Sequence, residues 1–121
     1  MRIGLKNIYP YLLIAGIAFA AYAQILRFDF VSLDEDTLIV GNQYFIGNIG
    51  NILEVFKHDV NYPSGFSAYY RPILTLTLMI DASVGGLNPL FYHFSNIVIH
   101  IIASLLVYIL LLKFNRGKTM P

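Results

Sequence analysis

The sequence predicts a membrane protein with two transmembrane helices joined by a structured external loop. Three observations predict it. The chain is 57% hydrophobic and only 12% charged. It contains two long uncharged apolar stretches, and every acidic residue lies between them. A soluble domain carries roughly 25% charged residues, so this composition indicates lipid as the main solvent.

The first apolar stretch, residues 7–26, contains no charged residue and matches the length of about 20 residues that a spanning helix needs. A cleaved signal peptide is the alternative, with Arg2 and Lys6 before the stretch and small alanines near its end. The stretch is longer than the roughly 7–15 residues of a signal-peptide core, and Phe19 and Tyr22 interrupt the small residues. These features favour a retained helix.

The second apolar stretch predicts a helix over residues 89–113, followed by a tail at 114–121. Asn88 suits the N-cap and Pro89 the first helical position. Basic residues flank both helices on their outer ends: Arg2, Lys6, Lys113, Arg116 and Lys118. Because positive flanks stay in the cytoplasm, we expect both termini there and residues 27–88 outside it, in a plasma, inner or endoplasmic reticulum membrane.

The composition also limits the possible partners and sites. The lipid bilayer is the first expected partner. A net charge of +1 with no basic run gives no indication of nucleic acid binding. The absence of cysteine excludes disulfides and thiolate metal sites.

The external loop, 27–88, contains segments with recognisable patterns. Residues 49–58 place apolar side chains at helical spacing, which predicts a short interfacial helix capped by Asn48 or Asn51. Residues 61–67 are rich in turn formers. Residues 72–80 alternate apolar and other side chains as a strand does, whereas Pro72 would equally start a helix. Periodicity alone leaves the two open.

Polar residues in the second apolar stretch share one helical face: His93, Asn96, His100 and Ser104. Lipid offers such groups no hydrogen bonds, so we expect them to face protein. They form either a packing stripe toward further transmembrane helices or, near His93, part of a site. The two histidines are too far apart to share a metal, at about 10.5 Å along the axis.

Two clusters in the loop have chemical potential: Asp34-Glu35-Asp36 and Tyr69-Tyr70-Arg71-Pro72. A carboxylate can accept a proton from an attacking hydroxyl, and a guanidinium can hold a phosphate. Together they suit transfer of a group from a lipid phosphate to an acceptor. Each cluster also has a plainer interpretation, since acids often mark a solvated boundary and an arginine beside tyrosines often anchors a chain at the interface.

The order of these motifs resembles a known family. The pattern F-V-x-x-D-E-x-x-x-I-x-x-N, then Y-R-P, then G-G-L-N-P-x-x-Y-H-x-x-N-x-x-x-H is similar to the start of the polytopic GT-C glycosyltransferases. The closest branch is the O-mannosyltransferase-like proteins that often bear tetratricopeptide repeats. The resemblance covers residues 28–112, and it implies an all-α fold in which residues 72–80 form an interfacial helix.

The resemblance also implies roles for individual residues. Asp34 corresponds to the catalytic base, and Glu35 to a residue that orients acceptor or donor. Arg71, with Tyr70, would bind the carrier phosphate, and His93 and Asn96 would line the mouth of the site. The donor would be a sugar on a polyprenyl or dolichyl phosphate, with no cofactor. Asp34 and Asp36 form a D-x-D pair that would bind a divalent metal in other branches, an alternative that we do not favour.

Members of that family have about ten or more spanning helices, whereas only two are predicted here. We therefore expect one module of a glycosyltransferase that is inactive alone. The alternative is a small two-helix membrane protein that assembles with partners without catalysis.

The predicted topology is testable by cysteine labelling in intact cells. A cysteine replacing Ser64 should react with a membrane-impermeant thiol reagent, because we expect it outside the cytoplasm. A cysteine replacing Thr119 should react only after the membrane is permeabilised. Labelling at Thr119 but not at Ser64 in intact cells would contradict the predicted orientation.

Overall fold

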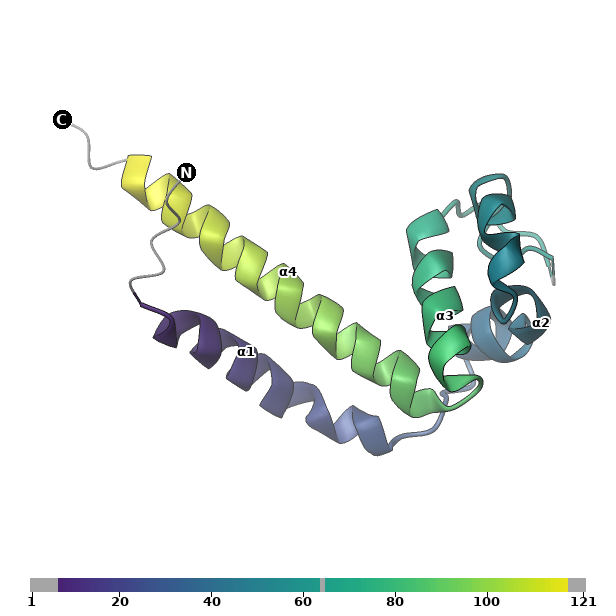
Figure 1. The fold of residues 1–121 in the computed structure, drawn as a ribbon, viewed down its shortest axis with the longest axis horizontal. Coiled ribbons are helices and arrows are strands. Elements are labelled where there is room, and N and C mark those ends of the chain that lie inside the picture. The colour runs from purple at the N-terminus through teal and green to yellow at the C-terminus, as the bar shows by residue number, and fades with distance from the viewer. Residues whose placement is uncertain (1–6, 64, 118–121) are drawn as a thin grey trace. The chain divides into compact units, whose positions relative to one another are not determined.

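The computed structural model describes residues 7–63 and 65–117, and every regular element in those ranges is helical. The elements are helices α1 (Tyr9–Tyr22), η1 (Ala23–Arg27), η2 (Asp36–Val40), α2 (Gln43–Ile46), η3 (Ile49–Phe56), α3 (Pro72–Gly85) and α4 (Pro89–Gly117) (Figure 1). Of these, η1 and η3 are 3-10 helices and η2 is a π-helix. The all-helical class is confirmed for the described residues. Several residues used for the topology prediction lie outside them: Arg2, Lys6, Ser64, Lys118 and Thr119.

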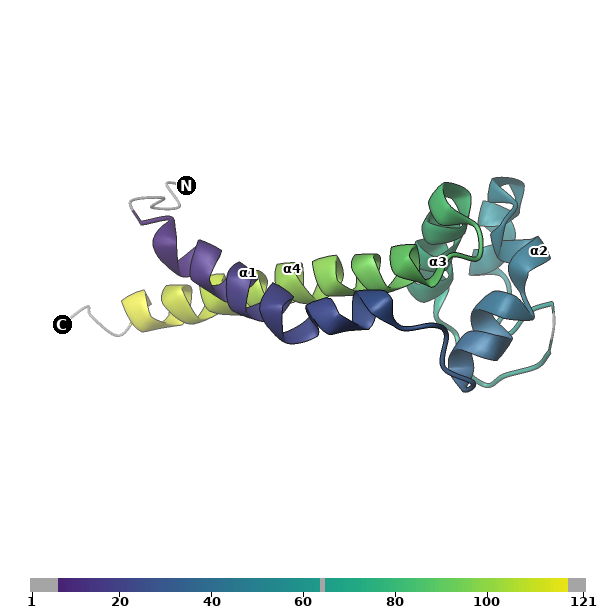
Figure 2. The same cartoon turned by 90° about the horizontal axis from the view of Figure 1, so that it is seen from below.

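The chain divides into two compact units. The first combines residues up to Ile25 with those from Asn96 onward, and the second comprises Leu26–Ser95. In the first unit α1 runs antiparallel to α4 (Figure 2). The Tyr11 ring contacts Tyr108 at 5.3 Å between centroids and Tyr22 contacts His100 at 4.9 Å, so later residues of α1 lie beside earlier residues of α4. Two helical stretches, Tyr9–Arg27 and Pro89–Asn115, are long and apolar enough to cross a membrane.

The second unit has its own hydrophobic core. Helix α2 packs against η2, η3 and α3, and α3 also packs against η3. The most deeply buried side chains are Ile46, Met79 and Tyr92, which are 1%, 1% and 2% exposed. They come from α2, α3 and the first turn of α4, so the core joins segments far apart in the sequence.

Helix α3 resolves the ambiguity over residues 72–80 in favour of a helix, as the resemblance implies. Pro72 occupies its first turn, and the Thr75 N–H donates to the Arg71 carbonyl at 3.2 Å. The threonines that gave the alternating pattern bond to their own helix, with Thr77 Oγ1 donating to the Leu74 carbonyl at 2.7 Å. Such back-bonding satisfies hydroxyls within an apolar helix.

Helix η3 confirms one predicted cap and changes the expected helix type. Asn48 Oδ1 accepts the Gly50 N–H at 2.9 Å, whereas Asn51 donates to the Phe45 carbonyl at 3.0 Å. The predicted short helix is present as a 3-10 helix, Ile49–Phe56, which ends two residues before His58. With three residues per turn, Val55 is buried at 4% exposure, while most of the expected apolar face is exposed: Ile49, Ile52, Leu53 and Phe56.

A tight corner joins α3 to α4. Asn88 Oδ1 accepts the Leu90 N–H at 3.1 Å, as predicted for the N-cap of the second apolar helix. Gly86 has φ 61° and ψ −125°, a conformation that is essentially restricted to glycine. A Cβ on Gly85 would lie 2.0 Å from the Phe91 ring, so glycine is needed there for close approach.

Replacing Gly86 by alanine should therefore destabilise the second unit by about 1–3 kcal/mol, because the side chain disfavours this backbone conformation. Thermal or denaturant unfolding of the purified chain in detergent would measure the change. Gly65→Ala is the matched control, since its φ is not positive and an added Cβ there meets only an ordinary contact at 3.8 Å. Equal stability of the two variants would contradict this account of the corner.

Candidate functional site

A pocket of about 400 Å³ in the second unit contains two of the predicted site residues. It is lined by Asp34, Thr37, Leu38, Val60, Asn61, Ser67, Tyr69 and Arg71. Asp34 begins the helical turn that leads into η2, and Arg71 is the N-cap residue of α3. The fold therefore places one acidic and one basic side chain, from distant loop segments, in the same pocket.

Hydrogen bonds hold the loop between η3 and α3 that forms one side of this pocket. The Val60 N–H donates to the Tyr69 carbonyl at 3.0 Å and closes the loop on itself. Asn42, only 2% exposed, donates from Nδ2 to the Tyr62 carbonyl at 3.1 Å. These bonds tie the loop to the segment between η2 and α2, so both sides of the pocket belong to one packed unit.

The two charged side chains in the pocket carry no ion pair within the described ranges of the chain. Asp34 and Arg71 are both exposed. The Arg71 guanidinium lies over the Tyr69 ring, with Cζ 4.9 Å from its centroid, which limits the directions that it can take. A free carboxylate and an oriented guanidinium in one pocket can accept a proton and bind a phosphate.

The neighbours of Asp34 do not line the pocket. The Glu35 carboxylate accepts the backbone N–H of Val31 and so stabilises its own turn. Asp36 is exposed and begins η2. Within residues 7–63 and 65–117, no group of three or more His, Cys, Asp or Glu side chains could hold a metal ion. Metal binding by Asp34 with Asp36 stays an untested alternative.

The other predicted binding residues lie elsewhere. The Tyr70 hydroxyl donates to the Phe56 carbonyl at 2.9 Å, so it ties the start of α3 to the end of η3. His93 is 7% exposed, its ring packs near Phe30 at 6.4 Å, and its Nε2 has no hydrogen-bond partner among the described residues. Asn96 belongs to the other unit.

Sequence reasoning assigned no binding role to most of the polar lining of the pocket: Thr37, Asn61, Ser67 and Tyr69, of which only Tyr69 belongs to a cluster named from the sequence. Two of these lie in the turn-rich segment 61–67, which had been recognised only as a connection. The sequence analysis gave the binding role to Tyr70, whereas Tyr69 lines the pocket. In a loop no spacing rule tells which of two adjacent side chains faces a pocket.

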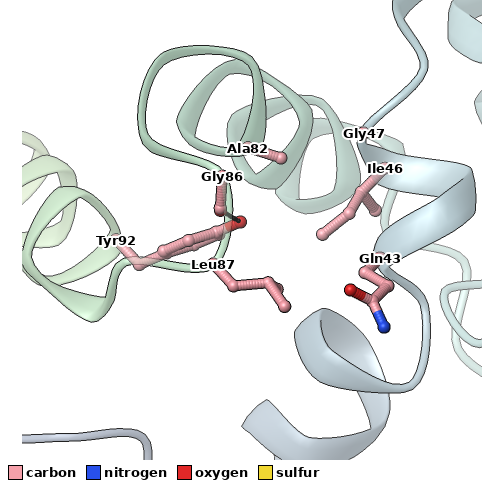
Figure 3. A pocket seen from close by; sticks show the side chains of 7 residues that line it. All are labelled: Gln43, Ile46, Gly47, Ala82, Gly86, Leu87 and Tyr92. Carbon is pink, nitrogen blue, oxygen red and sulfur yellow. Dashed lines mark hydrogen bonds between the residues drawn. The ribbon is translucent and has the colours of Figure 1, made fainter.

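A second, smaller cavity of about 130 Å³ lies at the corner between α3 and α4 (Figure 3). Gln43 and Ile46 border it from α2, and Tyr92 borders it from α4. The Tyr92 hydroxyl donates to the Gly86 carbonyl at 2.7 Å and so closes the corner. No charged side chain lines this cavity, so it offers no acid, base or phosphate-binding group.

A buried acid, Asp81, lies near this corner and was not singled out from the sequence. It is 8% exposed, and Ser95 Oγ donates to its Oδ2 at 2.7 Å. Burial raises the pKa of Asp81, and the hydrogen bond from Ser95 opposes the rise only in part. Asp81 does not line the pocket that contains Asp34 and Arg71.

Curated proteins that resemble this chain include three that are described as O-mannosyl-transferases. Protein O-mannosyl-transferase Tmtc1 of Drosophila melanogaster is 30% identical over 98 residues, which are 78% of this chain and 11% of the relative. Protein O-mannosyl-transferase F38B6.6 of Caenorhabditis elegans is 27% identical over 109 residues, 87% of this chain and 15% of that protein. Mouse TMTC2 is 43% identical over 37 residues, 31% of this chain and 4% of that protein.

These matches are consistent with the resemblance noted from the motifs, at the level of similarity to O-mannosyl-transferases. The chain spans only 11% and 15% of the fly and nematode relatives. No protein-family model matches the chain, and no solved structure matches it. What the whole relatives do therefore reaches this chain only as a proposal.

The raised pKa of Asp81 predicts how stability depends on pH. Stability from the protonated carboxyl is fully present below its unfolded pKa of about 3.9 and is lost as the pH rises through the higher folded pKa. Asp81→Asn should remove this loss and leave the protein more stable than the parent near pH 7. Unfolding of both proteins in detergent, from a pH below the unfolded pKa of the carboxyl up to pH 7, tests this prediction, with Asp29→Asn as the exposed control. A parent and an Asp81→Asn variant with parallel pH profiles would contradict the prediction.

Proposed function

We propose that this chain forms one module of a membrane glycosyltransferase that transfers a sugar from a polyprenyl or dolichyl phosphate to an acceptor outside the cytoplasm. The observation that carries the proposal is the pocket shared by Asp34 and Arg71. Similarity to O-mannosyl-transferases supports the reaction class. The described chain also contains two helical stretches long and apolar enough to span a membrane, which suits a lipid-borne donor.

In the proposed reaction, Asp34 acts as the general base. It takes the proton from the acceptor hydroxyl while that oxygen forms a bond to C1 of the sugar. The bond between C1 and the phosphate oxygen breaks, and its electrons remain on the departing lipid phosphate. Arg71 binds the phosphate and stabilises the charge that grows there. Attack opposite the leaving group inverts the configuration at C1.

The other lining residues suit the binding of sugar or acceptor groups. Hydroxyls from Thr37 and Ser67 can bond to polar substrates. Tyr69 lines the pocket, and the Arg71 guanidinium lies over its ring. We propose that Glu35, bonded to the Val31 N–H, orients the turn that carries Asp34 rather than contacting the substrate directly.

We further propose that the module depends on additional membrane helices to complete the donor site and is inactive without them. The relatives are many times longer than the matched stretch, which supports this division. A chimera is therefore the suitable protein for assays of activity. In it, residues 28–112 of this chain replace the matching segment of the Drosophila relative.

In that chimera, Asp34→Asn should lower the rate of mannosyl transfer from the lipid-phosphate donor by about 100- to 10,000-fold, the usual cost of losing a general base. Asp36→Asn is the matched control, because it removes the same charge beside the pocket but does not line it. It should leave the rate nearly unchanged. Correct insertion of each variant is checked by protease protection of the loop.

Arg71→Gln should raise the KM for the lipid-phosphate donor, whereas Lys57→Gln, which removes the same charge from a site paired with Glu54 at 2.7 Å, should not. Parent-like turnover by an inserted Asp34→Asn variant would refute the assignment of the base. Loss of activity in Asp36→Asn, together with a requirement for added Mn²⁺ or Mg²⁺, would replace this mechanism with the metal-dependent alternative.

A further inference from the structure

The polar residues of α4 divide into those with partners and those without. Ser104 Oγ donates to the His100 carbonyl of its own helix at 2.8 Å, so it needs no other partner. His93 is buried in the second unit. In the described part of the chain, the side chains of Asn96 and His100 form no hydrogen bond, although the His100 ring contacts Tyr22. Among the exposed members of the predicted stripe, Asn96 and His100 are therefore the ones with unused hydrogen-bonding groups in the described part of the chain.

Asn96 and His100 line a cavity within the first unit. Its volume is about 260 Å³, and its other lining residues are Tyr22, Ile25 and Ile97. Both polar residues are also exposed at the surface of the helix. They lie in the stretch that is long and apolar enough to span a membrane. Hydrocarbon provides no hydrogen bonds there, so whatever covers this surface should bring polar groups of its own.

The two polar residues belong to a longer stripe along α4. Asn96, His100, Ala103 and Val107 are spaced at i, i+4, i+7 and i+11, which places them on one face. All four are exposed, and Val107 is 56% exposed. The α1 helix contacts a neighbouring face, through Ile97 at the cavity and Tyr108. The Tyr22 ring of α1 touches His100 at one edge of the stripe, but all four residues stay exposed to another helix, and the small Ala103 would let that helix approach closely.

We propose that this stripe is a docking surface for a second copy of the chain. Two copies inserted in the same direction meet in parallel about a two-fold axis, so each residue faces its own counterpart. An amide carries both donor and acceptor groups, and so does a neutral imidazole, which makes Asn96 and His100 self-complementary. A carboxylate or an ammonium group at the same place would repel its counterpart. The inference does not depend on the proposed transferase activity.

Energy transfer between labelled copies of the full chain in lipid vesicles measures the association as the chain is diluted with lipid. The parent should dimerise, and Asn96→Val and His100→Phe should each weaken the dimer by about 5- to 30-fold, as loss of an interhelical hydrogen bond predicts. His100→Phe keeps a ring against Tyr22. Ser104→Ala is the matched control and should dimerise like the parent, because that hydroxyl bonds within its own helix.

Disulfide crosslinking provides a second readout that leaves both polar residues in place. The chain has no cysteine, so a single introduced cysteine reports alone. Ala103→Cys, on the stripe, should crosslink two copies efficiently, and Val98→Cys, on the opposite side of α4, should not. A chain that stays monomeric at every dilution would overturn the proposal. Equal dimerisation by the parent and both variants would do the same, as would equal crosslinking at the two cysteines.

Discussion

The packing of α2 against both η2 and α3 is the constraint on which the candidate site depends. Helix η2 follows the turn that carries Asp34, and α3 begins directly after Arg71, so α2 joins the two segments that border the pocket. Ile46 of α2 and Met79 of α3, each 1% exposed, form the centre of this contact. Burial of such side chains contributes about 1.5–3 kcal/mol each, far more than any surface interaction of the loop. The acid and the arginine are therefore held together by apolar packing rather than by an ion pair.

The sequence predicted well those features that depend on neighbouring residues. Asn88 and Pro89 marked the start of α4, and the cap of η3 is Asn48, one of the two asparagines that the sequence offered, because capping involves residues only two or three positions apart. The helical form of α3 was ambiguous from the sequence. Because this helix packs against both α2 and η3, apolar residues occur on more than one of its sides, and Leu74, Leu76 and Leu78 form a strand-like alternation. Asp81 was missed because its partner, Ser95, is 14 positions away and follows a glycine corner. Tyr69 received no binding role because the direction in which a loop side chain points is set by the tertiary structure and not by residue spacing.

The two units suit different tasks under this account. The second unit contains the charged pocket, where a phosphate-bearing donor and a hydroxyl acceptor can meet. The first unit contains most of both apolar helical stretches and, on α4, the exposed polar residues Asn96 and His100; under the proposals above it serves as a membrane anchor with a polar contact surface. Similarity to O-mannosyl-transferases covers 78% of the chain in the fly relative. That coverage is too broad to come from the acidic motif alone.

Photocrosslinking of two adjacent tyrosines tests the central claim most directly. A benzophenone side chain would replace either Tyr69, which lines the pocket, or Tyr70, whose hydroxyl bonds to the Phe56 carbonyl. The chimera of residues 28–112 with the Drosophila relative, in lipid nanodiscs, would then be irradiated in the presence of radiolabelled polyprenyl-phosphate mannose. The account predicts that position 69 captures the lipid-linked sugar, that position 70 captures little, and that Arg71→Gln abolishes the capture. Equal labelling at both positions, or labelling unaffected by Arg71→Gln, would contradict the assignment of this pocket as the donor site.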